Sequence, residues 1–140
     1  MPPLDRPERK PALVLIMDDN PEFVEFAREV VELCGHTPTT ITQPEKFKDT
    51  CVALKPQVVI LDIHMPDLDG MHLTQWLGEF AEAFGLQVRL VIISGRDEDT
   101  IQLCKSVAAM SGFNDVQAYN KPIEVATLTR ALSGLSGPSK

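Results

Sequence analysis

The sequence has little positive charge and lacks a long apolar run. Its 140 residues include 13 Lys and Arg against 20 Asp and Glu, a formal net charge of -7. Proteins that hold nucleic acid or anionic membranes through their own electric field need clustered positive charge, so we expect neither partner. The longest apolar run, from Ala12 to Met17, is far too short to cross a bilayer. The charge balance favours proteins or cations as partners.

Cysteine is scarce, and the first residues do not resemble a secretory leader. Cys34, Cys51 and Cys104 are odd in number, far apart and without zinc-ligand spacing, so we interpret them as core residues in a reducing compartment. Residues 1–10 are charged and proline-rich, with no apolar stretch of the kind found in signal peptides. We expect this segment to be a disordered arm and the protein to be cytoplasmic.

Nucleotide-binding glycine patterns are also missing. Neither G-x-x-x-x-G-K-[ST] nor G-x-G-x-x-G occurs, which disfavours nucleotide binding. A chain of this length is most simply one domain and can bury a core without disulfides or a structural metal. We expect the domain to cover residues 11–133, with 134–140 as a tail and no room for a second, effector domain.

Five apolar or β-branched segments alternate with five helical patterns. The predicted strands are 12–17, 37–42, 57–62, 87–93 and 116–119, and the predicted helices are 21–34, 44–54, 71–84, 98–111 and 122–133. Strict alternation predicts an α/β fold, because parallel neighbours need right-handed crossovers that place helices on both faces. We expect a flavodoxin-like, doubly wound five-stranded parallel sheet of order 2-1-3-4-5. Pro38 favours an edge position for the second strand.

Local signals refine the helices. Asn20 is a good N-cap, Pro21 a good first helical residue, and Gly35 and Gly85 are natural helix ends. Helical spacing places these side chains inward: Phe47, Cys51, Leu54, Leu73, Trp76, Leu77, Phe80 and Phe84. We expect His36 and His72 to be ordinary surface residues.

Polar residues follow four of the predicted strands. Asp18 and Asp19 follow the first, Asp62 the third, Ser94 the fourth and Lys121 the fifth. Ligands bind beyond the carboxyl ends of such strands where the strand order reverses, here between the first and third. Carboxylates about 4 Å apart repel by roughly 4 kcal/mol per pair at an effective dielectric constant of 20, so a cation must join them. Oxygen ligands suit Mg2+, whereas Ca2+ requires more of them.

The order of these motifs resembles the receiver domain of bacterial two-component response regulators. The resemblance spans roughly residues 11–133 and is to stand-alone receivers of the chemotaxis-regulator type. It depends on an acidic pair, an Asp-x-x-Met-Pro-x-x-Asp-Gly stretch, a strand-end Ser-Gly and a Lys-Pro, which here are Asp18-Asp19, 62–70, Ser94-Gly95 and Lys121-Pro122. Each motif alone is weak, since an isolated Asp-Asp pair usually caps a helix, and an isolated Ser or Lys-Pro usually forms a turn.

The resemblance implies roles for these residues. Asp62 would be the phosphoacceptor that receives a phosphoryl group from a histidine kinase or a phosphotransfer protein, giving an aspartyl phosphate. Mg2+ would be held by Asp18, Asp19, Asp62 and the backbone carbonyl of His64. Lys121 and Ser94 would contact the phosphoryl oxygens. Such a protein is no enzyme beyond its own phosphorylation and dephosphorylation.

The resemblance also implies a switch. Ser94 would move toward the phosphoryl group, and an aromatic residue two positions before the Lys, here Tyr119, would swing inward. The helix from Glu98, the strand ending at Tyr119 and the final helix would then present a changed surface to a downstream target protein, with a homodimer left open. The Lys121–Pro122 bond is expected to be cis, as it is in the family.

The sequence departs from the usual receiver pattern in two places, and two alternative functions stay open. The interval from Ser94 to Lys121 is longer than in most receivers. In this respect the sequence resembles receivers found ahead of cyclic-di-GMP phosphodiesterase domains, and we expect an extended helix in the interval. Arg96 and His64 are bulky groups beside the acceptor and are expected to control water access.

One alternative is a receiver-like interaction module that is never phosphorylated. The other is a phosphatase of the haloacid dehalogenase type, which requires an Asp at the position of His64.

Overall fold

The computed structural model describes residues 11–62, 64–65, 68–95, 98–113 and 115–135, with only the backbone of 64, 65, 68–71, 98–101 and 104. Within these ranges the chain alternates between strands and helices. The elements are β1 (Leu13–Met17), α1 (Pro21–Leu33), β2 (Thr37–Ile41), a 3-10 turn η1 (Pro44–Lys46), α2 (Phe47–Leu54), β3 (Val58–Leu61), β4 (His64–Met65), β5 (Leu68–Asp69), α3 (Gly70–Ala83), β6 (Arg89–Ser94), α4 (Glu98–Met110), β7 (Val116–Asn120) and α5 (Val125–Ala131). No described helix is long and apolar enough to cross a membrane.

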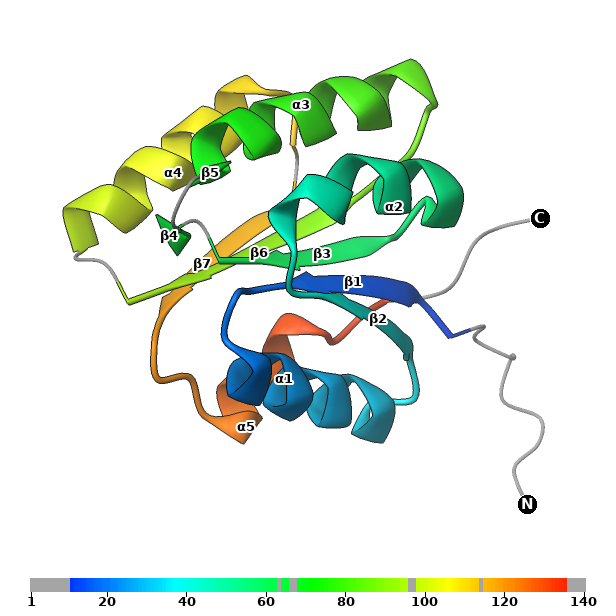
Figure 1. Ribbon diagram of the computed structural model, residues 1–140, viewed down its shortest axis with the longest axis vertical. Coiled ribbons are helices and arrows are strands. Elements are labelled where there is room, and N and C mark those ends of the chain that lie inside the picture. The colour runs from blue at the N-terminus through cyan, green and yellow to red at the C-terminus, as the bar shows by residue number, and fades with distance from the viewer. Residues whose placement is uncertain (1–10, 63, 66–67, 96–97, 114, 136–140) are drawn as a thin grey trace.

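The five predicted strands form one parallel sheet in the order β2-β1-β3-β6-β7. Counted along the chain this is the predicted order 2-1-3-4-5. Helices α1 and α5 cover one face of the sheet, and α2, α3 and α4 cover the other (Figure 1). β2, which contains Pro38, is an edge strand as predicted. The flavodoxin-like architecture is therefore confirmed.

The central strands contribute side chains alternately to two cores. One cluster lies under α2, α3 and α4, and its strand members are Leu15, Met17, Val59, Leu61, Leu90 and Ile92. The other lies under α1 and α5, and its strand members are Val14, Ile16, Val58, Ile60, Val91 and Ile93. All twelve side chains are fully buried, as expected of strands with helices packed on both faces.

Polar caps and glycines set the helix ends. The Asn20 side chain accepts a hydrogen bond from the Glu22 N–H at 2.9 Å, and α1 begins at Pro21 as predicted. At the end of α4, Gly112 has a φ of +103°, which favours glycine. The Gly112 and Phe113 N–H groups donate to Ala109 and Ala108, so the helix ends in a Schellman motif that buries Phe113.

Helix α3 approaches the end of α4 at Gly78. A Cβ atom added at Gly78 would collide with the backbone carbonyl oxygen of Ser111. Ser111 immediately follows α4, within the interval that the sequence analysis identified as unusually long. The absence of a side chain at Gly78 therefore lets the two helices meet at this point.

Several local predictions were wrong. Phe84 was expected inward but is 57% exposed, because α3 ends at Ala83 and Phe84 lies beyond it. The last helix begins at Val125 rather than at 122, because the backbone of Glu124 is extended, with φ -85° and ψ 156°. The antiparallel β4–β5 pair was not predicted. Residues 1–10 lie outside the described part of the chain.

Two further side chains differ from expectation. His36 is half-buried, and its Nδ1 accepts a hydrogen bond from the Ala12 N–H at 3.0 Å, so it holds the start of β1. Leu135, predicted to belong to the tail, is buried against the α1/α5 core. Cys51 is buried as predicted, and desolvation raises the pKa of its thiol to about 12. Cys34 is half-buried, and the side chain of Cys104 lies outside the description.

Candidate functional site

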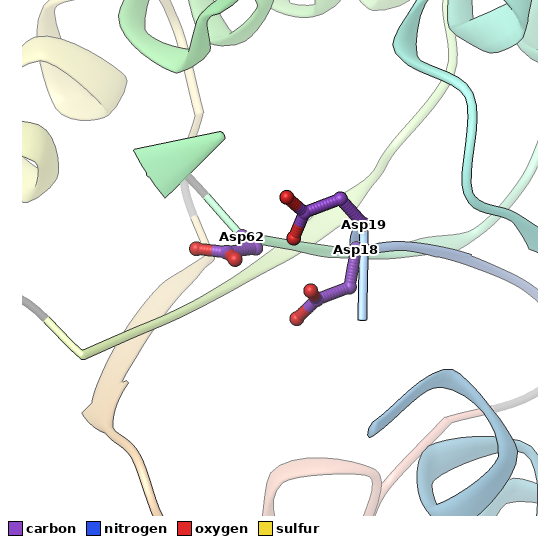
Figure 2. Close-up of side chains that lie close together, drawn as sticks. All are labelled: Asp18, Asp19 and Asp62. Carbon is purple, nitrogen blue, oxygen red and sulfur yellow. The ribbon is translucent and has the colours of Figure 1, made fainter. Parts of the chain in front are cut away.

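Three predicted carboxylates meet where β1 and β3 end. Asp18 and Asp19 follow β1, and Asp62 follows β3, its parallel neighbour. Backbone hydrogen bonds fix both strand ends, since the Asp62 N–H donates to Met17 at 3.1 Å and the Asp18 N–H to Ile41 at 3.3 Å. The side chains lie close together (Figure 2), with one carboxylate oxygen from each all within 4.8 Å of one another. The predicted acidic cluster is therefore present.

The cluster runs from the protein interior to solvent. Asp18 is fully buried, Asp62 is 5% exposed and Asp19 is exposed. Asp18 Oδ1 accepts a hydrogen bond from the Asn20 N–H at 2.9 Å. Asp18 Oδ2 accepts one from Lys121 Nζ at 2.6 Å, while Asp62 Oδ2 lies 3.4 Å from the same nitrogen. One ammonium thus joins the two buried carboxylates.

Burial and charge shift the ionisation of this group. Desolvation, assisted by the charge of Asp62, raises the pKa of Asp18, although the hydrogen bonds from Lys121 and Asn20 oppose the rise. Burial alone would lower the pKa of Lys121, but its hydrogen bond to Asp18 and the charges of Asp18 and Asp62 outweigh burial and raise it. Lys121 is therefore a permanent cation, and it lies beside the Asp18 carboxylate, whose ionised form is disfavoured by burial.

Ser94 and Lys121 lie at adjacent strand ends. Ser94 is the last residue of β6 and is fully buried. Its backbone carbonyl accepts a hydrogen bond from the Lys121 N–H at 2.9 Å. The Lys121–Pro122 peptide bond is cis, as the resemblance implied. The structure thus brings the predicted Ser and Lys to the same edge of the sheet as the acidic cluster.

Tyr119 and Ala118 face opposite sides of β7. Tyr119 packs against the α1/α5 core, and its hydroxyl donates to the Gln117 Oε1 at 2.7 Å. Ala118 packs against the other core, under α3 and α4. The aromatic ring predicted to act in a switch therefore lies on the α1/α5 side of the sheet.

Of the two residues predicted to flank Asp62, one is described by its backbone alone and the other is not described. The backbone of His64 begins β4, two residues after Asp62, but its side chain lies outside the description. Arg96 lies outside the described residues altogether. The carbonyl ligand at His64 and the control of water access by these two residues stay predictions.

Two contacts at the site were not predicted from the sequence. The backbone N–H of Asn20 binds Asp18, although only the capping role of the Asn20 side chain was predicted. The ring of Phe23, in the first turn of α1, lies with its centroid 4.6 Å from Lys121 Nζ. Phe23 lies three residues after the N-cap Asn20, and this closeness was the available signal for a place near the site.

The donor set fits a divalent metal. Three carboxylates against one ammonium leave two negative charges in excess, two of the acids being almost fully buried. Mg2+ binds through one or two carboxylates with several waters, and exposed Asp19 leaves the cluster open to solvent on one side. Asp18, Asp19 and Asp62 are therefore the described residues suited to hold Mg2+.

Comparison with known proteins gives the class of this fold and site. The sequence model of the response regulator receiver domain matches residues 14–133. The chain therefore belongs to the response regulator receiver family. Receiver domains are signalling modules rather than classical enzymes. The matched range includes the acidic cluster, Ser94 and Lys121.

Individual relatives agree with this assignment. Protein PilH of Pseudomonas aeruginosa is 30% identical over 128 residues, which cover 89% of this chain and 97% of PilH. Protein RcaC of Microchaete diplosiphon is 30% identical over 67 residues, 48% of this chain but only 10% of RcaC. The chemotaxis protein CheY4 of Vibrio cholerae shares the fold, with a TM-score of 0.72 at 17% identity over 87% of this chain and 96% of CheY4.

Proposed function

We propose that this receiver accepts a phosphoryl group on Asp62 from the phosphohistidine of a histidine kinase or a phosphotransfer protein. The observation that carries the proposal is the position of Lys121 Nζ, 2.6 Å from Asp18 and 3.4 Å from Asp62. A carboxylate at a strand end, beside a permanent cation and two further acids, suits attack on a phosphorus atom.

The transfer exchanges one bond for another. A carboxylate oxygen of Asp62 forms a bond to phosphorus, the phosphorus–nitrogen bond of the donor breaks, and the imidazole nitrogen keeps the electron pair. Lys121 supplies positive charge for the phosphoryl oxygens, a role in which a compact ammonium is effective. Because Asp62 is 5% exposed, the reacting oxygens are partly shielded from water, which strengthens this interaction.

The acidic cluster provides the metal ligands for this reaction. Asp18, Asp19 and Asp62 would hold Mg2+, together with the backbone carbonyl of His64. When bound, Mg2+ would neutralise the negative charge of the transferring phosphoryl group. Asp18 is oriented for this purpose by the Asn20 N–H, which fixes one of its oxygens at 2.9 Å.

Phosphorylation would change a protein-binding surface through Ser94. A phosphoryl group adds charge of about -1.5 to -2 and several acceptor oxygens, which attract a nearby hydroxyl donor. The Ser94 backbone is bonded to Lys121, so a movement of Ser94 would be felt at the end of β7 as well as at the start of the α4 segment. Tyr119, two residues before Lys121, would change orientation with this strand end and signal to a downstream target protein.

Intact-mass spectrometry after incubation with acetyl phosphate tests the proposal. We expect one phosphoryl adduct on the wild type with Mg2+, and none without Mg2+ or in Asp62→Asn. Asp49→Asn, which removes an exposed carboxylate of α2, is the matched control and should keep the adduct. Absence of any adduct on the wild type would reject the proposal in favour of an interaction module that works without phosphorylation.

A further inference from the structure

The ring of Phe23 faces the ammonium of Lys121. Phe23 lies in the first turn of α1, and Lys121 follows β7, so the contact joins two elements far apart in the sequence. The centroid of the ring is 4.6 Å from Nζ, well inside the range of about 6 Å in which a cation is attracted to the face of an aromatic ring. The ring is half-buried and packs at a tilt against Phe26, with their centroids 6.0 Å apart.

Among the described residues, the Lys121 ammonium therefore has two carboxylates and one aromatic ring as neighbours. Its nearest partner is the Asp18 carboxylate at 2.6 Å, followed by the Asp62 carboxylate at 3.4 Å, with the Phe23 ring as the third. Asp18, the nearest partner, is also one of the residues suited to hold Mg2+. The ammonium and the metal would compete for the same carboxylate.

The Phe23 ring can hold the Lys121 ammonium in place when the metal binds Asp18. A hard cation such as Mg2+ prefers oxygen ligands and retains much of its water shell, so it binds the Asp18 carboxylate rather than a phenyl ring. Lysine is flexible and strongly hydrated, and the Lys121 side chain is 24% exposed, so a weakened bond to Asp18 would let it swing toward solvent. Among the described contacts of the Lys121 ammonium, the contact with the Phe23 ring is the one that involves no candidate metal ligand.

We propose that Phe23 is a positioning residue for Lys121, whose ring keeps the ammonium beside Asp62 when Asp18 binds the metal. This inference rests on the proposed function, because its purpose is to keep the lysine ready for the phosphoryl oxygens. The ring touches no reacting atom and acts only through Lys121.

Stepwise fluorination of the ring tests the electrostatic part of the proposal. Phenylalanines with one to three ring fluorines, placed at position 23, keep the shape nearly constant while weakening the attraction to a cation. We expect the rate of phosphorylation by acetyl phosphate to fall with each fluorine, reaching about two- to fivefold, the loss expected for a partly exposed cation–π contact. The affinity for Mg2+, measured by calorimetry, should stay constant, since the ring is no ligand.

Phe26 provides the matched control. It lies in the same helix, contacts the Phe23 ring and packs against the same core. The fluorinated series at position 26 should leave the phosphorylation rate unchanged. Equal rates across the series at position 23, or equal losses at both positions, would overturn the proposal and assign Phe23 to packing alone.

A spectroscopic measurement separates this proposal from the proposed function. A lysine over a ring face has side-chain proton resonances shifted upfield by the ring current, so the Lys121 signals should move downfield in Phe23→Leu and stay in place in Phe26→Leu. The shift is to be followed with and without Mg2+, and it should persist with Mg2+ in the wild type. Loss of the shift on adding Mg2+ would overturn the proposal. A wild type that shows the shift in both conditions but accepts no phosphoryl group would reject the proposed function instead.

Discussion

Lys121 is bonded more closely to Asp18 than to Asp62, with Nζ–Oδ2 distances of 2.6 Å and 3.4 Å. The cation proposed to meet the phosphoryl group is thus bound first to a residue proposed to hold the metal. If both proposed roles hold, lysine and metal would compete for Asp18 before phosphorylation, and a variant that lacks the ammonium would bind the metal more tightly.

Replacing Lys121 by Gln should strengthen Mg2+ binding while abolishing most phosphorylation. Without the competing ammonium, we expect the dissociation constant for Mg2+ to fall by about tenfold. Without metal, the free energy of unfolding should fall by about 3 kcal/mol, because the fully buried Asp18 carboxylate loses its charged partner. Calorimetry and urea unfolding with and without Mg2+ measure both effects.

Lys48→Gln is the control for this prediction. Lys48 also lies over an aromatic ring, that of Trp76 at 5.6 Å, but it is exposed on α2. It should change neither the Mg2+ affinity nor phosphorylation. Weaker Mg2+ binding in Lys121→Gln would show that the lysine assists the metal rather than competes with it.

Replacing Asp18 by Asn should stabilise the metal-free protein at neutral pH. The amide oxygen can still accept the Asn20 N–H, while the buried charge, whose pKa is raised by desolvation, is removed. We expect a gain of about 1 kcal/mol in the free energy of unfolding in EDTA, and loss of the stabilisation by Mg2+. A variant less stable than the wild type in EDTA would contradict this account.

The gain in unfolding free energy from Asp18→Asn should depend on pH. Because the pKa of Asp18 is higher in the folded than in the unfolded state, the folded protein binds this proton more tightly and gains stability from it as the pH falls through the raised value. The difference between Asp18→Asn and the wild type should therefore shrink from neutral pH toward the ordinary Asp value of 3.8. The raised pKa of Lys121 acts only at alkaline pH, where its stabilisation is lost as the pH rises through the folded value. Urea unfolding of Asp18→Asn and the wild type between neutral pH and the ordinary Asp value measures how the difference in stability shrinks.

Replacing Gly78 by Ala should destabilise the protein although Ala is the better helix former. The added methyl group would meet the Ser111 carbonyl oxygen, which belongs to backbone and cannot turn aside. Overpacking costs about 1 to 3 kcal/mol and outweighs a propensity gain of about 1 kcal/mol. Thermal unfolding of Gly78→Ala and of its exposed neighbour Glu79→Ala measures the contrast. A stabilised Gly78→Ala would show that α3 and α4 can separate freely at this point.

Replacing Arg89 by Lys should destabilise the end of the sheet far from the acidic cluster. The Arg89 guanidinium donates to the Asp115 carboxylate at 2.7 Å and to the carbonyls of Ala131 and Ser133 at 2.9 Å and 2.7 Å, joining β6, the segment before β7 and the end of α5. An ammonium cannot reproduce this fork, so we expect a loss of about 1 to 3 kcal/mol in unfolding free energy. Arg28→Lys on the surface of α1 should change it by less than about 0.5 kcal/mol. Equal effects would mean that the Arg89 contacts add nothing beyond a surface ion pair.

The sheet and the acidic cluster could be predicted because both follow from the spacing of apolar runs. Five such runs separated by helical patterns fix a parallel sheet, and parallel strands bring the residues after their carboxyl ends to one edge. Asp18, Asp19 and Asp62 follow their strands directly, so their positions needed no knowledge of loops or side-chain rotation.

The contacts of long side chains could not be predicted in this way. Lys121 has four rotatable carbon bonds, and nothing in its spacing tells that Asp18 is a closer partner than Asp62. Phe23 satisfies helical periodicity whether it faces the core or the ammonium. The β4–β5 pair was missed because two residues per strand are too few to show an alternating pattern.

The two faces of β7 differ in the rotational freedom of the side chains next to the switch position. Tyr119 has two side-chain torsions and a hydroxyl, so it can rest in more than one orientation on the α1/α5 side. On the opposite side Ala118 offers a methyl group, which has no alternative rotamers. A change at Ala118 can therefore reach α4 only as a displacement of the backbone, whereas on the α1/α5 side the Tyr119 side chain can also rotate.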